Sequence, residues 1–262
     1  VKELVASFCI TLHLIGEKDW NDPNLVIIDT RDNISYRFRH IKNARPLEIE
    51  RVISVADNGA NLVIDGSIAE KVFTELGIDN SKTVVVYGEY GDPSAARVVW
   101  TLMYHGHPNV KLLDIGFSQW QKAALPTTRQ IPTLKPSTFL FKSKINSTIR
   151  ADAEIIKAKQ GDPNVIIVDA RTAQEHFQAR IPGSILHNWE EGLDDDSGRV
   201  IRYKDELQKD FEQRGITKDK EIICYCHSGT RASHKYLQLK EAGFNNVRMY
   251  DGSIIDWAQR HN

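Results

Sequence analysis

Six consecutive residues near the C-terminus place a thiol among groups that can ionise it. The run 226–231, Cys-His-Ser-Gly-Thr-Arg, lies between an apolar strand-like stretch, 221–225, and a helix-like one, 232–242. A loop at the start of a helix aims backbone N–H groups and the positive end of the helix dipole at one point, which stabilises a thiolate or a bound anion. We therefore predict that Cys226 is the catalytic nucleophile.

The five residues after this thiol are predicted to bind substrate. Arg231 has a guanidinium fork suited to a sulfonate or carboxylate, and as a plain surface residue it would be disfavoured by the dipole of the first helical turn. His227 could hydrogen-bond the substrate or add positive charge, or be a loop residue with neither role. Ser228 and Thr230 supply hydroxyl donors or cap the helix, and Gly229 permits a backbone angle that a β-carbon would forbid.

The remaining cysteines and the overall charge limit the class of protein. Cys9 and Cys224 lie in apolar stretches and are interpreted as core residues. Three cysteines are too few for a disulfide scaffold, which favours a reducing, cytoplasmic location. The stretch 4–15 is read as a strand and the start of a helix, not as a signal peptide.

Charge and motif content give no sign of a nucleic-acid partner, a membrane partner or a cofactor. The chain has 34 basic and 35 acidic residues, a net charge of −1, and no long basic run. It also lacks the C-x-x-C spacing of many metal sites. We expect no metal and no organic cofactor.

The chain contains an internal repeat. Residues 22–31 recur as 162–171 with six identities in ten, and the apolar run 83–87 corresponds to 221–225. This pattern predicts a duplicated domain.

Each half alternates short apolar, β-branched runs with helical stretches such as 94–105 and 232–242. Runs of this kind are typical of parallel strands buried on both faces, so each half is predicted to be an α/β structure. Between the halves, a segment with three prolines and no helical period is predicted to be a linker. The predicted domains are 1–124 and 143–262, with the linker at 125–142.

Four motifs, in this order, resemble those of the rhodanese sulfurtransferases. They are Asp-x-Arg after an apolar strand, Ile-Pro-Gly-Ser at 181–184, Tyr-Cys-x-x-Gly-x-Arg at 225–231, and Tyr-Asp-Gly-Ser followed by Trp257. The resemblance spans nearly the whole chain in the two-domain form. It implies tandem rhodanese-like domains, each a small parallel sheet flanked by helices, with a persulfide carried on Cys226. It also implies an active site at the domain interface and a catalytically inactive N-terminal domain.

The repeat agrees with an inactive first half. Gly88 or Glu89 stands opposite Cys226, so neither alignment supplies a thiol. The pairs Asp29-x-Arg31 and Asp169-x-Arg171 occur in both halves. They are therefore interpreted as structural charge pairs at the strand ends.

Other activities use similar loops. Cysteine phosphatases have Cys-x5-Arg, whereas four residues separate Cys226 from Arg231 here. The tighter loop favours a single sulfur atom above the thiolate over a phosphoryl group. A phosphatase or arsenate reductase is thus a weaker alternative, and a non-catalytic binding module is another.

The sulfur donor is inferred from the character of the loop. Mercaptopyruvate enzymes commonly resemble Cys-Gly-Ser-Gly-Val-Thr, and thiosulfate enzymes often carry extra basic residues. With His227 and Arg231 the loop favours thiosulfate, and 3-mercaptopyruvate is the alternative. Cyanide, a small thiol, thioredoxin or another partner protein are all compatible acceptors.

Overall fold

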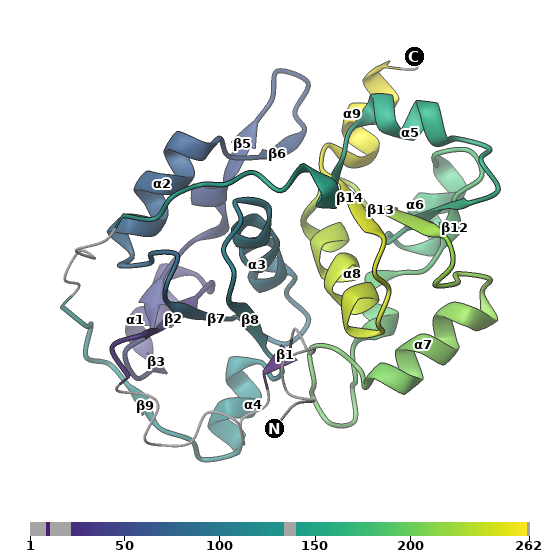
Figure 1. Cartoon of the computed structure of the whole chain (residues 1–262). Coiled ribbons are helices and arrows are strands. Elements are labelled where there is room, and N and C mark those ends of the chain that lie inside the picture. The colour runs from purple at the N-terminus through teal and green to yellow at the C-terminus, as the bar shows by residue number, and fades with distance from the viewer. Residues whose placement is uncertain (1–8, 11–21, 134–139, 261–262) are drawn as a thin grey trace. The chain divides into compact units, whose positions relative to one another are not determined.

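The computed structural model describes residues 9–10, 22–133 and 140–260, which form two compact units (Figure 1). The first unit contains the described residues up to Val52, those within Ile64–Ile145, and the segment Asp195–Val200. The second contains Ile53–Val63, Asn146–Asp194 and the residues from Ile201 onward. Each unit thus includes a short segment from the other half of the sequence. The linear boundaries at 124 and 142 stay a prediction.

The first unit is built on a parallel five-stranded sheet. Its strand order is β1 (Cys9–Ile10), β8 (Val110–Leu113), β7 (Thr83–Tyr87), β2 (Leu25–Asp29) and β4 (Arg45–Pro46). Its helices are α1 (Asn33–Phe38), the 3-10 helix η3 (Ile49–Val52), α2 (Gly66–Glu75), α3 (Ser94–Tyr104) and α4 (Phe117–Lys122). A small antiparallel pair joins β3 (His40–Ile41) to β9 (Thr127–Thr128).

The second unit repeats this plan. Its sheet order is β10 (Arg150–Ala151), β14 (Val247–Tyr250), β13 (Glu221–Tyr225), β11 (Val165–Asp169) and β12 (Ile185–Leu186), again all parallel. Its helices are η4 (Ser147–Ile149), α5 (Ala153–Lys159), α6 (Ala173–Gln178), η5 (Trp189–Gly192), α7 (Lys204–Gln213), α8 (Thr230–Glu241) and α9 (Ser253–Arg260). The predicted tandem α/β architecture is confirmed.

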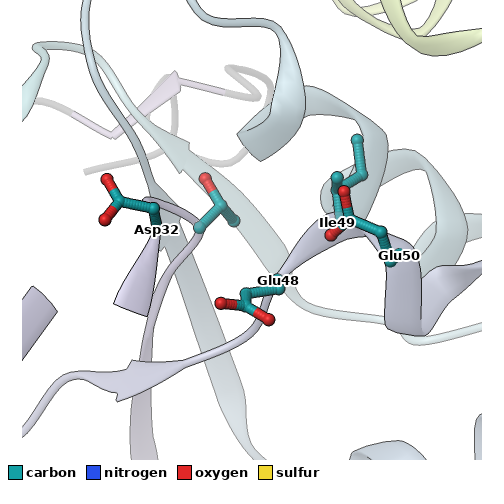
Figure 2. A pocket seen from close by; sticks show the side chains of 5 residues that line it. Asp32, Glu48, Ile49 and Glu50 are labelled. Atoms are coloured by element: carbon teal, nitrogen blue, oxygen red, sulfur yellow. The ribbon is translucent and has the colours of Figure 1, made fainter. Parts of the chain in front are cut away.

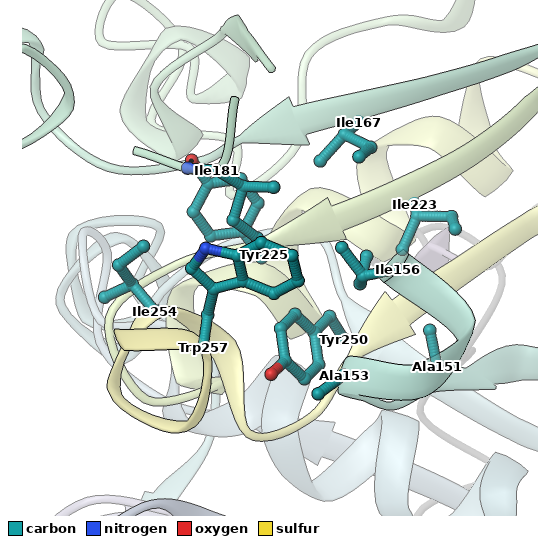
Figure 3. Close-up of a cluster of buried hydrophobic side chains, with 10 residues drawn as sticks. All are labelled: Ala151, Ala153, Ile156, Ile167, Ile181, Ile223, Tyr225, Tyr250, Ile254 and Trp257. Atoms are coloured by element: carbon teal, nitrogen blue, oxygen red, sulfur yellow. Dashed lines mark hydrogen bonds between the residues drawn. The ribbon is translucent and has the colours of Figure 1, made fainter. Parts of the chain in front are cut away.

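Alternation along β13 divides the core of the second unit into two layers. Ile223 and Tyr225 point into a cluster with Ile254 and Trp257 of α9 (Figure 3). Cys224 lies on the opposite face, where its thiol contacts the backbone of α8 at Ala232. Because every second side chain points the same way, an all-apolar strand buries both faces.

A hairpin from the first half of the sequence belongs to the second unit. Strands β5 (Ile53–Val55) and β6 (Asn61–Val63) form an antiparallel pair. The Asn58 side chain donates to Asp256 of α9 at 2.9 Å, and Val63 N donates to Asp251 at 2.8 Å. These hydrogen bonds attach the hairpin beside the segment that follows β14.

Two expectations concern segments that are described only in part. Of the predicted strand and helix start at 4–15, only Cys9–Ile10 lies within the described residues, where it forms β1. The described part of 125–142 contains β9 and no helix. Among the described residues, no helix combines the length and apolarity needed to cross a bilayer.

Candidate active site

The loop at 226–229 connects the carboxyl end of β13 to the first turn of α8. Gly229 N–H donates to the Sγ atom of Cys226 at 3.1 Å. Gly229 has φ = +96°, a left-handed conformation that L side chains rarely adopt, and α8 begins at the next residue. The glycine therefore turns its N–H back toward the thiol at the positive end of the helix dipole.

Ser253 fixes the other side of the loop. Its hydroxyl accepts from Cys226 N–H at 3.1 Å, donates to Tyr250 O at 2.9 Å, and lies 4.0 Å from Cys226 Sγ. Ser253 is fully buried and has φ = +54°. Ser253 is the last residue of the Tyr-Asp-Gly-Ser motif, but the sequence alone did not predict this role for it.

The thiol lies below the surface, next to a pocket. Cys226 is 1% exposed, while His227 is exposed and Ser228 and Thr230 are half-buried. The pocket has a volume of about 320 Å³ and is lined on one side by Arg171, Glu175, Gln178 and Ala179, and on the other by His227, Ile254, Ile255 and Ala258. Cys226 does not line it directly.

Arg231 forms a bidentate ion pair with Glu175. Its two terminal nitrogens donate to the two carboxylate oxygens, each at 2.7 Å. The same carboxylate accepts from the Thr172 backbone and hydroxyl in the capping box that starts α6. The hydrogen bonds from Arg231 are the main reason that the pKa of Glu175 falls to about 2.

The ion pair bears on the predicted substrate-binding role of Arg231, which stays a prediction. The predicted substrate fork is already engaged by a carboxylate that sequence reasoning did not identify. The sequence feature that could have pointed to Glu175 was the Thr-x-x-Glu capping pattern at 172–175.

Asp169 is the last residue of β11, and its side chain binds several groups at the carboxyl ends of the strands, beside Cys226. Its buried carboxylate accepts from Arg171 Nε and Nη2 at 2.9 and 2.6 Å, from His176 Nδ1 at 2.9 Å and from the Tyr225 hydroxyl at 2.8 Å. Arg171 also donates to Ala179 O at 2.6 Å, so the pair ties the end of α6 to the strand.

The first unit contains the corresponding ion pair, between Asp29 and Arg31. Asp29 accepts from Arg31 Nε and Nη2 at 3.0 and 2.7 Å, and Arg31 donates to Arg39 O at 2.7 Å. The structural role predicted for both Asp-x-Arg pairs is therefore confirmed.

At the corresponding point of the first unit, a side chain would be crowded by a neighbouring hydroxyl. A β-carbon added to Gly88 would lie 2.8 Å from the hydroxyl oxygen of Thr30. That hydroxyl donates to Tyr87 O at 3.1 Å. At the repeat position of Thr30 the second unit has Ala170, which lacks this hydroxyl.

A pocket of about 330 Å³ near this point in the first unit is acidic. Figure 2 shows the carboxylates of Asp32, Glu48 and Glu50 around it, and Thr30 and Ile49 complete the lining. Three carboxylates repel an anionic sulfur donor. The two pockets thus differ in charge.

Cys224 is a structural thiol. It is fully buried, and its Sγ donates to Ala232 O at 3.4 Å and to Arg248 O at 3.5 Å. Burial raises its pKa well above the ordinary value, so it stays protonated and unreactive.

A cluster of metal-binding residue types forms an ion-pair network in this structure. His187, Glu191 and Asp210 lie close together. Arg214 donates to both oxygens of Glu191, and Lys235 Nζ lies 2.8 Å from His187 Nδ1. Both carboxylate oxygens of Glu191 and the Nδ1 atom of His187 are therefore already engaged by basic side chains.

Comparison with known proteins agrees with this geometry. The family model of the rhodanese-like domain matches residues 16–123 and 152–260. A putative thiosulfate sulfurtransferase of Mycobacterium tuberculosis is 30% identical, over 92% of this chain and 91% of the relative. The sulfur carrier protein TtuD of Thermus thermophilus is 29% identical, over 91% of each chain.

Solved structures show the same fold. The crystal structure of the 3-mercaptopyruvate sulfotransferase SseA from Escherichia coli superposes with a TM-score of 0.84 at 26% identity, covering 94% of this chain and 98% of that one. The two family matches together cover most of the sequence, one in each half. This chain therefore belongs to the rhodanese family and contains two rhodanese-like domains.

Proposed function

We propose that this protein is a sulfurtransferase that moves a sulfane sulfur from thiosulfate to cyanide or a thiol through a persulfide on Cys226. The observation that carries the proposal is the 3.1 Å hydrogen bond from Gly229 N–H to Cys226 Sγ at the start of α8. A donor in this position stabilises negative charge on the thiolate and then on the persulfide. Relatives named thiosulfate sulfurtransferase that match most of the chain support the assignment.

The reaction has two displacement steps. The Cys226 thiolate attacks the outer sulfur of thiosulfate, the sulfur–sulfur bond of the donor breaks, and sulfite leaves with the electron pair. The acceptor then attacks the outer sulfur of the persulfide, and the electron pair of the broken bond returns to Cys226 Sγ. With cyanide the product is thiocyanate. No external oxidant or reductant is needed, and the thiolate is regenerated.

Mass spectrometry tests this proposal directly. Incubation with thiosulfate should add one sulfur atom to the intact chain, and cyanide should then remove it. The same spectra separate the rival classes, because a non-catalytic binding module would gain no sulfur. Turnover of an aryl phosphate faster than sulfur transfer would favour the phosphatase reading.

The donor is 3-mercaptopyruvate in the second candidate function. The structural similarity to SseA favours it, and so does the ion pair that engages Arg231. Comparing kcat/KM for the two donors with cyanide as acceptor distinguishes them. We retain thiosulfate first because several relatives at about this identity are named for it.

Glu175→Gln should improve the use of thiosulfate. Glutamine retains oxygen and N–H groups at this position but removes the negative charge, so the Arg231 guanidinium becomes available to the donor. Releasing an ion pair of about 1 kcal/mol corresponds to a decrease of about fivefold in the KM for thiosulfate. Initial rates at fixed cyanide concentration measure this change.

The matched control is Glu154→Gln in the first turn of α5. It removes the same charge from an exposed acid that has no contact with Arg231. An unchanged or increased KM in Glu175→Gln would show that Arg231 does not contact the donor.

We also propose a reducing, cytoplasmic location, since a reactive thiolate must stay unoxidised between turnovers. A small thiol, thioredoxin or another protein is proposed as the physiological acceptor.

A further inference from the structure

A short turn after β14 supports the loop that carries the nucleophile. We call residues 251–256 the supporting turn. The Ser253 hydroxyl accepts from Cys226 N–H at 3.1 Å. Ile254 N donates to Cys226 O at 3.1 Å, and the next N–H of the turn donates to His227 O at 3.3 Å. The first two residues of the loop are thus bonded to the supporting turn, so a shift of the turn would displace the thiol.

The supporting turn has a conformation that neighbouring contacts must maintain. Ser253 has φ = +54°, in the left-handed region that L side chains rarely adopt. A β-carbon added to Gly252 would lie 2.6 Å from the β-carbon of Asp256, so the chain is closely folded here. Such a conformation persists only where its surroundings hold it. Asp251 and Asp256, the buried residues at the two ends of the turn, are the points where other elements bind it.

The β5–β6 hairpin, which comes from the first half of the sequence, binds both ends of the supporting turn. Val63 N–H donates to the Asp251 carboxylate at 2.8 Å. The Asn58 amide donates to Asp256 Oδ1 at 2.9 Å, and Gln259 Nε2 donates to Asn58 O at 3.2 Å. The hairpin and the turn belong to the same compact unit. Residues far apart in the sequence therefore hold the turn on which the thiol loop rests.

The contact at Asp251 has a counterpart in the first unit. Aligned on the tryptophans at 120 and 257, Asp114 corresponds to Asp251. Arg199 Nη1 donates to the Asp114 carboxylate at 2.7 Å, and Val200 N donates to Asp114 O at 2.9 Å. A contact of this kind also occurs where the catalytic loop has no cysteine, so folding alone accounts for it.

The contact at Asp256 differs between the units. In the same alignment Gln119 corresponds to Asp256. Among the described residues, the side-chain oxygen of Gln119 has no hydrogen-bond partner. The Asp256 carboxylate, in contrast, accepts from Asn58. This hydrogen bond thus distinguishes the unit that contains the thiol from the unit that lacks it.

We propose that Asn58 is a positioning residue for Cys226. By holding Asp256 it keeps the supporting turn in the conformation that fixes the thiol loop, so that Gly229 N–H stays directed at Sγ. Asn58 acts through the turn and not by contact with the reacting sulfur. The inference deepens the proposed function, since it rests on Cys226 as the nucleophile.

Asn58→Asp tests the hydrogen bond with little change of shape. The aspartate retains the oxygen that accepts from Ala60 N at 3.0 Å, so the turn of the hairpin is preserved. Its second oxygen faces the Asp256 carboxylate and repels it. Because a small displacement of a reacting atom lowers its rate of attack, sulfur loading from thiosulfate should slow by about tenfold. Alkylation of Cys226 by iodoacetamide, located by peptide mass spectrometry, should slow by about the same factor.

Three further variants separate the hydrogen bond from the added charge. Asn58→Ser removes the amide donor without a charge and should slow both reactions by about threefold. Asn58→Asp combined with Asp256→Asn exchanges donor and acceptor, and should restore both rates to within about threefold of the wild type. Asn61→Asp is the matched control, because the described residues give the Asn61 side chain no hydrogen bond to the supporting turn. Its rates should stay within about twofold of the wild type.

The decisive comparison is between reactivity and stability. Urea unfolding of each variant gives its stability, and both rates are measured where the protein is folded. If Asn58→Asp and Asn58→Ser lower stability but leave both rates unchanged, Asn58 is only structural and the proposal is wrong. Equal slowing by Asn61→Asp would also overturn it. If the wild type is alkylated at Cys226 but gains no sulfur from thiosulfate, the proposed function fails, and the alkylation rates still decide the role of Asn58.

Discussion

Cys226→Ser should reduce sulfur transfer from thiosulfate to cyanide by roughly 10⁴-fold or more. A serine hydroxyl fits the same space and can accept the Gly229 N–H, so the loop should persist. Its oxygen is a poor nucleophile toward sulfur and cannot hold a sulfane sulfur as a stable anion. The variant should therefore fold normally, turn over neither donor and gain no sulfur by mass spectrometry.

Cys224 provides a matched control. Cys224→Ser makes the same atomic change two residues earlier, at a thiol whose hydrogen bonds go to Ala232 O and Arg248 O. A hydroxyl has one hydrogen, as the thiol does, and can donate it to either carbonyl, so loading with sulfur should be retained. If Cys224→Ser abolished loading while Cys226→Ser retained it, the assignment of the nucleophile would be wrong.

Asp169→Asn should destabilise the protein by about 3–5 kcal/mol. The carboxylate is fully buried and accepts from Arg171, His176 and Tyr225. The amide has nearly the same shape but carries no charge and offers only one oxygen, which leaves the buried guanidinium uncompensated. Urea unfolding of variant and wild type measures the difference.

The effect should depend on pH in a definite direction. Burial alone would raise the pKa of Asp169, but hydrogen bonds from Arg171 and His176 outweigh it, so the folded pKa lies below the ordinary value. The stability from this ionisation is therefore complete above the unfolded pKa, near 3.9, and is lost as pH falls through the folded pKa. The wild type should approach the stability of Asp169→Asn in strong acid.

Asp29→Asn is the corresponding change in the first unit, where Arg31 takes the place of Arg171. We expect a loss of similar size from it. A loss below about 1 kcal/mol in both variants would mean that these pairs contribute little to folding.

The sequence was sufficient where function depends on residues adjacent in the chain. The Cys-His-Ser-Gly-Thr-Arg run, the glycine with positive φ and the helix after it are local features, and local propensities determine them. The duplication showed that each half repeats one α/β plan. The absence of a cysteine at Gly88 or Glu89 distinguished the two halves from the sequence alone.

The tertiary structure decided which distant side chains meet. Glu175 engages Arg231 across 56 residues, and Ser253 supports Cys226 across 27. The hairpin residue Asn58 binds Asp256 across 198 residues. A periodic pattern predicts a helix or strand and its buried face, but not which helix end packs beside which loop. Those pairings depend on how the elements pack around the sheet, and here they determine the charge around the thiol and the walls of its pocket.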